Sequence, residues 1–255
     1  MISKNQIKHI QSLHSKKNRE EEALFIVEGV KLVTEFVNQQ QYQIKEVLAT
    51  TEYLKDFGNL LEEKQILYTE LTAEELKKIS LQITPNQVLA IVYQIKSSLD
   101  LTILKSSTSL YLDDIRDPGN LGTIIRIADW FGIKQVICSE NCTEIYNPKT
   151  LQASMGAILR VSVLSLSFEE LLKTTGNMPI YGALLKGENI YKTSLQRGII
   201  VIGNEANGIS EEILKKITHP ITIPSADNNG SESLNAANAC AIICSEFHRQ
   251  LTYIN

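Results

Sequence analysis

The sequence predicts an α/β protein with two domains, the second built on a parallel sheet that carries helices on both faces. Short β-branched and apolar runs recur along the chain, and helical patterns separate them. One stretch rich in Ser and Thr, at residues 96–108, lacks any clean period. Strands that alternate with helices are typical of parallel sheets, because a parallel crossover needs a long connection. We therefore expect a small α/β domain at 1–95, a linker at 96–108 and a second α/β domain at 109–255.

In the first domain, residues 24–93 alternate between the two patterns. Apolar runs of strand length recur, and amphipathic stretches with apolar residues three and four positions apart stand between them. The expected strands are 24–29, 44–50, 65–69 and 87–93, and the clearest helices are 30–40 and 72–80.

In the second domain the alternation restarts with a strand at 109–114, a D-P-G-N turn at 117–120 and a helix with an apolar stripe. That stripe is Leu121, Ile124, Ile125, Ala128 and Phe131. Further strands are expected at 134–140, 179–185 and 198–205, and helical stretches at 147–159, 168–175 and 233–251. The last helix would pack on the sheet through Leu234, Ala237, Ala241, Cys244, Phe247 and Leu251.

The composition is that of a globular protein: its 255 residues are 43% apolar and 21% charged. The N-terminal segment has charged and amide side chains throughout, and no apolar run is long enough for a signal peptide or a membrane span. We expect a cytoplasmic protein.

The net charge of -4 argues against holding nucleic acid by bulk electrostatics, so any RNA contact must be local. The basic leader, residues 1–20, is a candidate phosphate contact, although a solvated first helix explains it equally well. Its basic residues are Lys4, Lys8, Lys16, Lys17 and Arg19.

Four cysteines lie in apolar surroundings: Cys138, Cys142, Cys240 and Cys244. Without a sign of an oxidising compartment we expect reduced thiols. Two C-x-x-x-C pairs have enough ligands for zinc, but small core residues at helical spacing explain the second pair as well. We predict no metal site.

Three segments have residues suited to chemistry. In the first, Pro118 and Gly119 turn the chain after a strand, Asn120 stands at the entry to a helix, and Arg126 projects from its second turn. In one interpretation, Asn120 caps the helix and Arg126 is a surface charge. The other places both beside a ligand crevice, where sites of open α/β sheets lie.

In the second segment an apolar strand runs into Gly203, Asn204 and Glu205, followed by Gly208 and by Ser210 as a helix cap. A carboxylate at the mouth of a buried strand is costly to leave unpaired, which makes Glu205 a candidate site residue. An ordinary strand-to-helix loop is the alternative. The segment is neither a phosphate loop nor a dinucleotide fingerprint, because the residues that define those motifs are missing.

In the third segment a strand ends at Pro224, a polar loop follows, and Ser233, Leu234 and Asn235 open the last helix. Asn235 and Asn238 are poor helix formers, so their amides are expected to have partners. Those partners are either capping N–H groups or a site.

Taken together, the three segments resemble the motifs of the SpoU (TrmH-like) family of RNA ribose methyltransferases in the SPOUT superfamily. The matching motifs are N-x-G-x-x-x-R at 120–126, G-x-E-x-x-G at 203–208 and I-P to S-L-N at 223–235. The first domain resembles the substrate-binding domain of rRNA-modifying members, through its basic leader and the F-I-V-E-G run at 25–29. Two departures leave the polar positions intact: Ser225-Ala226-Asp227 replaces a commoner Met and small-residue turn, and Ala-Ala follows S-L-N.

The resemblance implies a sheet whose C-terminal segment is threaded into a deep trefoil knot, and a homodimer that forms through the knot region. It also implies S-adenosylmethionine as cofactor, held largely by backbone groups. The cofactor positions are Ala183, Leu184, Gly203, Asn204, Ile223 and Leu234.

The implied reaction is attack of a ribose 2′-oxygen on the sulfonium methyl, at a site of five residues. These are Asn120, Arg126, Glu205, Ser233 and Asn235. A guanidinium with a pKa above about 12 is a poor base, so we expect Arg126 to clamp the adjacent phosphate and to lower the pKa of the hydroxyl. Asn120 would contact the ribose or hold Arg126, Glu205 would orient Arg126 or a cofactor loop, and Ser233 with Asn235 would shape the pocket.

The RNA substrate is expected to be ribosomal rather than transfer RNA, by analogy of the first domain. A catalytically silent RNA-binding protein of the same fold is an alternative, against which the intact set of polar motif residues speaks. An unrelated small-molecule α/β enzyme is disfavoured, because a phosphate loop and a glycine fingerprint are lacking.

Overall fold

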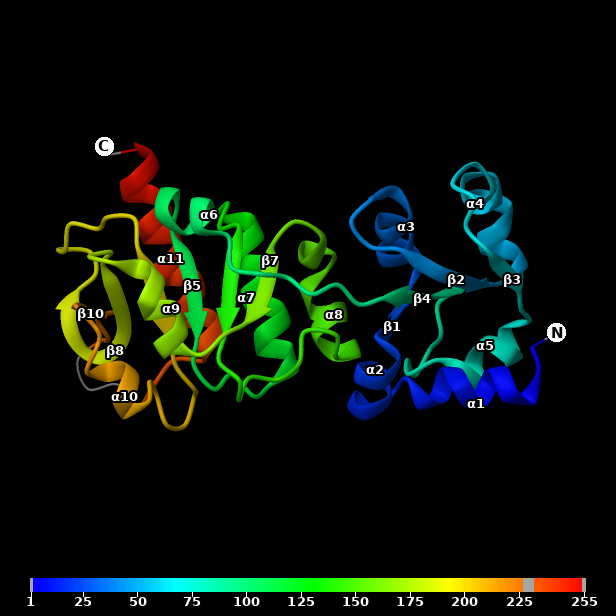
Figure 1. The fold of residues 1–255 in the computed structure, drawn as a ribbon, viewed down its shortest axis with the longest axis horizontal. Coiled ribbons are helices and arrows are strands. Elements are labelled where there is room, and N and C mark those ends of the chain that lie inside the picture. Colours follow the sequence, from blue (N-terminus) through cyan, green and yellow to red (C-terminus); the bar gives the residue numbers. More distant parts are fainter. Residues whose placement is uncertain (1, 227–231, 254–255) are drawn as a thin grey trace. The chain divides into compact units, whose positions relative to one another are not determined.

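The computed structural model describes residues 2–226 and 232–253, and the chain forms two compact units (Figure 1). The first comprises Met1–Lys96 and Tyr146–Leu159, and the second comprises Ser97–Ile145 and Arg160–Asn255. The sequence pattern predicts one linker, at 96–108, and so places 146–159 in the second domain. The structure differs because the Tyr146 ring stacks on Phe25 at 4.4 Å and its hydroxyl bonds the backbone of Ile95.

The first unit contains a mixed four-stranded sheet in the order β1-β4-β2-β3. β4 (Val88–Tyr93) lies antiparallel between β1 (Leu24–Glu28) and β2 (Ile44–Ala49), and β3 (Tyr68–Glu70) pairs parallel to β2. The predicted α/β domain is confirmed. Its helices are α1 (Lys4–Ser12), α2 (Lys16–Glu22), α3 (Val30–Asn38), α4 (Thr51–Glu63), α5 (Ala73–Ile79), α8 (Pro148–Ser154) and the 3-10 turn η1 (Ala157–Leu159).

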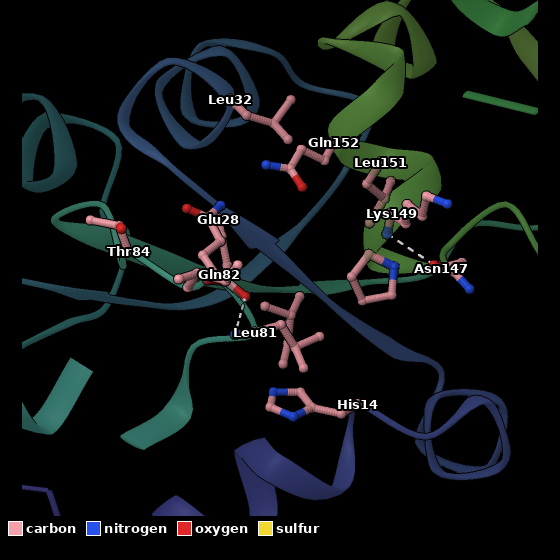
Figure 2. A pocket seen from close by; sticks show the side chains of 13 residues that line it. His14, Glu28, Leu32, Leu81, Gln82, Thr84, Asn147, Lys149, Leu151 and Gln152 are labelled. Atoms are coloured by element: carbon pink, nitrogen blue, oxygen red, sulfur yellow. Dashed lines mark hydrogen bonds between the residues drawn. The ribbon is translucent and has the colours of Figure 1, made fainter. Parts of the chain in front are cut away.

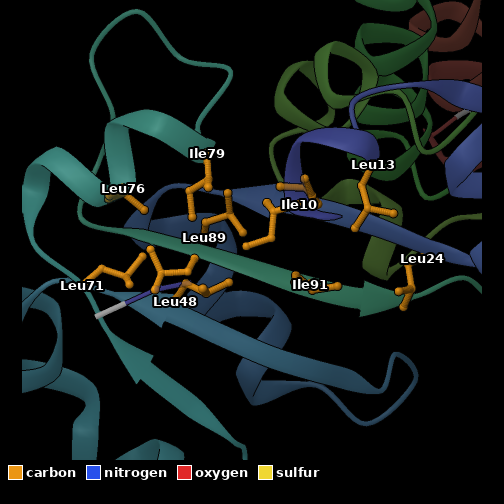
Figure 3. Close-up of a cluster of buried hydrophobic side chains, with 11 residues drawn as sticks. Ile10, Leu13, Leu24, Leu48, Leu71, Leu76, Ile79, Leu89 and Ile91 are labelled. Carbon is orange, nitrogen blue, oxygen red and sulfur yellow. The ribbon is translucent and has the colours of Figure 1, made fainter. Parts of the chain in front are cut away.

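Strand alternation gives this sheet two apolar faces. One packs against α1 and α5 through the cluster in Figure 3, where Ile10 of α1 lies with Leu76 and Ile79 of α5 near Leu89. The other face has an aromatic cluster around the fully buried Phe25. Its ring centroid lies 5.9 Å from those of Phe36 and Tyr42, and Tyr146 completes the cluster.

We expect Phe25→Ala to lower the free energy of unfolding by about 3–5 kcal/mol, because it leaves a cavity that three neighbouring rings cannot fill. Urea denaturation followed by circular dichroism measures the change. Leu67→Ala is the control, since Leu67 is 67% exposed and its loss should stay within about 0.5 kcal/mol. Equal stabilities of the two variants would contradict this assignment of the core.

The second unit contains a six-stranded sheet in the order β10-β8-β9-β5-β6-β7, and every neighbouring pair is parallel, as predicted. The strands are β5 (Ser109–Leu112), β6 (Gln135–Cys138), β7 (Ser162–Ser165), β8 (Ile180–Asn189), β9 (Ile199–Ile202) and β10 (His219–Thr222). The helices are α6 (Leu101–Ser106), α7 (Pro118–Trp130), α9 (Phe168–Thr175), α10 (Glu211–Leu214) and α11 (Ala236–Tyr253).

Helices cover both faces of this sheet, which confirms the prediction. α6, α9 and α10 bury Leu104, Phe168 and Ile213 against one face. On the other face α11 packs against α7, and its Phe247 ring meets Tyr181 of β8 at 4.9 Å. Within the described residues, no helix is both long and apolar enough to cross a membrane.

Three boundaries differ from the sequence analysis. The segment predicted as a linker contains α6, because Asp100 caps it and Leu104 is buried. D-P-G-N is the first turn of α7 rather than a turn before it, because Asp117 accepts a hydrogen bond from the backbone N–H of Asn120 at 2.9 Å. α11 begins at Ala236 instead of Ser233, and Leu234, predicted in its buried stripe, is 48% exposed.

Candidate functional site

The three predicted segments follow strands of the same parallel sheet. The first follows β5, the second follows its neighbour β9, and the third follows the edge strand β10. Carboxyl ends of parallel strands share one edge of a sheet, where ligands bind in open α/β folds. Part of the third segment, residues 227–231, lies outside the described residues.

A chain of side-chain hydrogen bonds joins one residue from each segment. Asn235 donates from Nδ2 to Asn120 Oδ1 at 3.0 Å, and Asn120 donates from its own Nδ2 to Glu205 Oε1. Asn120 therefore uses both ends of its amide to connect the other two. It is free to do so because Asp117 rather than Asn120 caps α7, which corrects the capping interpretation.

Asn235 combines both roles that the sequence left open. Its Oδ1 accepts hydrogen bonds from the backbone N–H groups of Ala237 at 3.0 Å and Asn238 at 3.2 Å. The same amide thus caps α11 and holds Asn120. Helix α11 is positioned by the residue that connects it to the site.

The backbone of the second segment closes tightly on itself. Asn204 and Gly208 exchange two backbone hydrogen bonds, of 3.0 and 2.9 Å, and Gly208 has a φ of +69°. A Cβ on Gly203 would lie 2.5 Å from the carbonyl oxygen of Gly208 and from the backbone nitrogen of Ile209. Gly203 is therefore required by the close approach of the two ends of this loop.

Two acidic residues at the end of β5 anchor the same loop, and the sequence analysis assigned them no role. Asp113, 6% exposed, accepts a hydrogen bond from the backbone N–H of Ser210 at 2.7 Å. Asn204 donates to the carbonyl oxygen of Asp114 at 2.7 Å. The Ser210 hydroxyl makes no capping bond. Their position directly after an apolar strand is the sequence signal by which they could have been identified.

A cavity of 1180 Å³ opens beside this loop, and all six predicted cofactor positions line it: Ala183, Leu184, Gly203, Asn204, Ile223 and Leu234. Glu205 and Ser233 line it as well, so Glu205 belongs both to the cavity and to the hydrogen-bonded chain. Apolar side chains such as Ile209 and Ile243 form much of the remaining wall. Apolar walls with a few polar groups suit a ligand with a flat heterocycle and polar edges.

The structure does not bring Arg126 together with these residues. Arg126 is exposed on α7, and within the described part of the chain no hydrogen bond or ion pair joins it to Asn120 or Glu205. Six residues correspond to about 240° around a helix. The two side chains of the first motif therefore leave α7 in different directions, and the expectation that Asn120 or Glu205 holds Arg126 is not met.

The basic leader is only partly available to a ligand. Lys4, Lys8, Lys16 and Lys17 are exposed, and the last two form ion pairs with Glu20 and Glu21 at 3.6 and 3.8 Å. Arg19, predicted to contact phosphate, is 2% exposed and donates to the carbonyl oxygen of Leu13 at 2.7 Å. Its role is structural, because that bond joins α2 to the end of α1.

The cysteines are free thiols. A hydrogen bond with the Cys138 thiol is the main cause that lowers the pKa of Cys142 to about 7. Across the described residues, no three His, Cys, Asp or Glu side chains are grouped as metal ligands.

Comparison with known proteins gives two family matches. Residues 107–245 match the model of the SpoU rRNA Methylase family, and residues 4–90 match the MRM3-like substrate binding domain. The chain is 29% identical to the 23S rRNA (guanosine(2553)-2′-O)-methyltransferase RlmP of Bacillus subtilis, over 94% of this chain and 95% of that one. It is 30% identical to the human mitochondrial rRNA methyltransferase 3, over 58% of this chain and 36% of the relative.

Several solved structures match nearly the whole chain, and two of them have a TM-score of 0.85. One, from Porphyromonas gingivalis and described within the TrmH family of RNA methyltransferases, is 36% identical, with a TM-score of 0.85 over 98% of this chain and 99% of that one. The other is an AdoMet-bound rRNA methyltransferase from Sinorhizobium meliloti, 25% identical, with a TM-score of 0.85 over 99% and 97%.

Proposed function

Because the chain belongs to the SpoU rRNA methylase family, as its three motifs predicted, we propose that it methylates a ribose 2′-hydroxyl in ribosomal RNA with S-adenosylmethionine. One observation of the site carries this proposal: the hydrogen-bonded chain from Glu205 through Asn120 to Asn235 joins all three motifs beside the large cavity. Two relatives that match over nearly the full length are rRNA methyltransferases, which favours ribosomal over transfer RNA. A cytoplasmic location agrees with such a substrate.

The cavity fits S-adenosylmethionine. Its close-packed loop at Gly203 lines the cavity, and the apolar walls suit an adenine ring. We assign cofactor binding to Ala183, Leu184, Gly203, Asn204, Ile223 and Leu234. When bound, the cofactor supplies an electrophilic methyl group on a positively charged sulfur.

The chain's own residues then align the RNA and promote loss of the proton from the 2′-hydroxyl. We assign to Arg126 the phosphate next to the target ribose, because its guanidinium is exposed, remains charged and binds phosphate with two parallel hydrogen bonds. The nearby positive charge lowers the pKa of the 2′-hydroxyl, whose proton leaves to water. Asn120, Glu205, Ser233 and Asn235 hold the ribose side of the cavity in place.

Two further features that the family resemblance implies are the knot and the homodimer. We propose that the C-terminal segment of the chain is threaded into the trefoil knot of the family, and that the chain forms a homodimer through the knot region, with α7 and α11 at the interface. The exposed aromatic residues on these helices support the second point: Trp130 is 82% and Tyr253 75% exposed, and His248 contacts the rings of Phe131 and Tyr253. Exposed aromatic groups are enriched at interfaces.

Sedimentation equilibrium tests the assembly. We expect a mass of twice one chain for the wild-type protein and of one chain for Trp130→Glu, because a charge at the centre of an apolar interface is costly to bury. Tyr191→Glu is the control, since Tyr191 is 52% exposed on another part of the second unit. A wild-type protein of single-chain mass would overturn the dimer.

Calorimetry with S-adenosylmethionine, followed by transfer of its labelled methyl group to unmodified 23S rRNA, tests the activity. We expect binding of the cofactor, and radioactivity in an alkali-resistant dinucleotide, the product of a blocked 2′-hydroxyl. The absence of cofactor binding at high concentration would refute the proposed function.

A further inference from the structure

We propose that a second cavity, confined to the first unit, binds an unpaired nucleobase of the RNA substrate. The cavity has a volume of 640 Å³ and is lined by strand β1, helix α3, the loop after α5 and helix α8. Figure 2 shows Gln152 and Leu32 at one end, His14 at the other, and Glu28 with Gln82 between them. This inference rests on the proposed function, because that function makes RNA the ligand.

The polar groups of the lining match the edge of a base. Three side-chain amides, of Gln82, Asn147 and Gln152, and the hydroxyl of Thr84 line the cavity. An amide offers donors and an acceptor side by side, as a base edge does. Asn147 uses its Oδ1 to cap α8 at Lys149 N, 2.9 Å away. Gln152 is exposed, and its side chain has no hydrogen-bond partner in the described part of the chain.

The remaining lining suits a planar ring. Ile26, Leu32 and Leu151 supply apolar surface, and two residues on the loop after α5, Leu81 and Ile83, are 48% and 100% exposed. Large apolar side chains left in solvent beside a cavity mark a binding surface. The volume lies in the range of small-molecule pockets, roughly 300–1,000 Å³, and exceeds what an ion needs.

The charges favour a base over a run of phosphates. Glu28 accepts hydrogen bonds from the Ser80 hydroxyl at 2.5 Å and from the backbone N–H of Leu81 at 3.0 Å, so its carboxylate holds the loop. Burial lowers the pKa of His14, whose Nε2 lies 3.1 Å from the carbonyl oxygen of Ile79. A lowered pKa disfavours the charged form of this ring, and Lys149 is the one lysine of the lining. Binding a duplex would need several basic groups.

Helix α8 completes this cavity from a distant part of the sequence. Residues 147–152 lie outside the segment that matches the substrate-binding domain, residues 4–90. They nevertheless belong to the first unit. The amides of Asn147 and Gln152 thus give this cavity a polar wall that the matched segment alone does not supply.

The test compares Gln82→Leu/Gln152→Leu with wild type on unmodified 23S rRNA made by transcription. Each lost hydrogen bond to a base weakens binding several-fold. We expect the KM for RNA to rise about tenfold, while kcat and the KM for S-adenosylmethionine stay unchanged. Gln40→Leu is the control, because Gln40 is exposed in the same unit and does not line the cavity.

Ultraviolet cross-linking of the same RNA, without cofactor, is the second measurement. We expect cross-linked peptides that contain residues 81–84 or 147–152. An unchanged KM for RNA in the double variant, or cross-links confined to other segments, overturns the inference. Normal methylation with either result leaves the proposed function standing, whereas cross-links at the cavity without methyl transfer support the cavity and refute the function.

Discussion

Replacing Arg126 with alanine is expected to lower kcat for RNA methylation by about 10²–10⁴-fold, the range over which one group that assists proton transfer acts. The dissociation constant of S-adenosylmethionine should not change, because Arg126 does not line the cofactor cavity. Single-turnover kinetics with labelled cofactor and calorimetry measure the two quantities. The loss has two causes, because alanine removes the paired hydrogen bonds that align the phosphate and also the charge that lowers the pKa of the 2′-hydroxyl.

Arg126→Lys distinguishes a role of the paired hydrogen bonds to phosphate from a role of the positive charge alone. Lysine keeps the charge but not the paired hydrogen bonds, so we expect most of the loss to persist. Arg197→Ala is the matched control, because Arg197 is also an exposed arginine of the second unit. Near-full turnover of Arg126→Lys would refute the two-point clamp on phosphate.

Replacing Gly203 with alanine is the second change with a large expected effect. Its Cβ would lie 2.5 Å from two backbone atoms of Gly208 and Ile209, and backbone cannot rotate away as a side chain does. Overpacking of this kind costs about 1–3 kcal/mol. We therefore expect the dissociation constant of S-adenosylmethionine to rise by about 10- to 100-fold in calorimetry.

Gly58→Ala provides the control for this substitution. Gly58 lies within α4 of the first unit, and a Cβ there meets nothing within 4 Å. We expect unchanged cofactor affinity and a stability gain of about 0.5–1 kcal/mol, because alanine favours a helix. A Gly203→Ala protein that binds cofactor as wild type does would contradict the assigned loop geometry.

The sequence predicted the strands and helices whose apolar pattern is strong. The apolar runs that became β5, β6 and β9 are fully buried, and buried strands of a parallel sheet are recognisable from composition. Helix α4 was not identified, because Gly58 interrupts it. The place of 146–159 depends on the contact between Tyr146 and Phe25, which are distant in sequence, and local patterns do not record such contacts.

The sequence predicted which segments form the candidate site, but not the hydrogen bonds that join their side chains. Motif order identified Asn120, Glu205 and Asn235, whereas their mutual hydrogen bonds depend on which residue caps α7. A sequence shows several capping candidates in D-P-G-N and does not rank them. The prediction that Arg19 contacts phosphate is wrong for a similar reason. Basic composition does not reveal that its guanidinium donates a hydrogen bond to the carbonyl oxygen of Leu13.

Ribose-methylation mapping of total RNA from a deletion strain tests the central claim most directly. We expect that one 2′-O-methylated position in ribosomal RNA disappears, that the wild-type chain restores it, and that Arg126→Ala does not. A methylation profile identical to that of the parent strain, or a loss confined to transfer RNA, would contradict it.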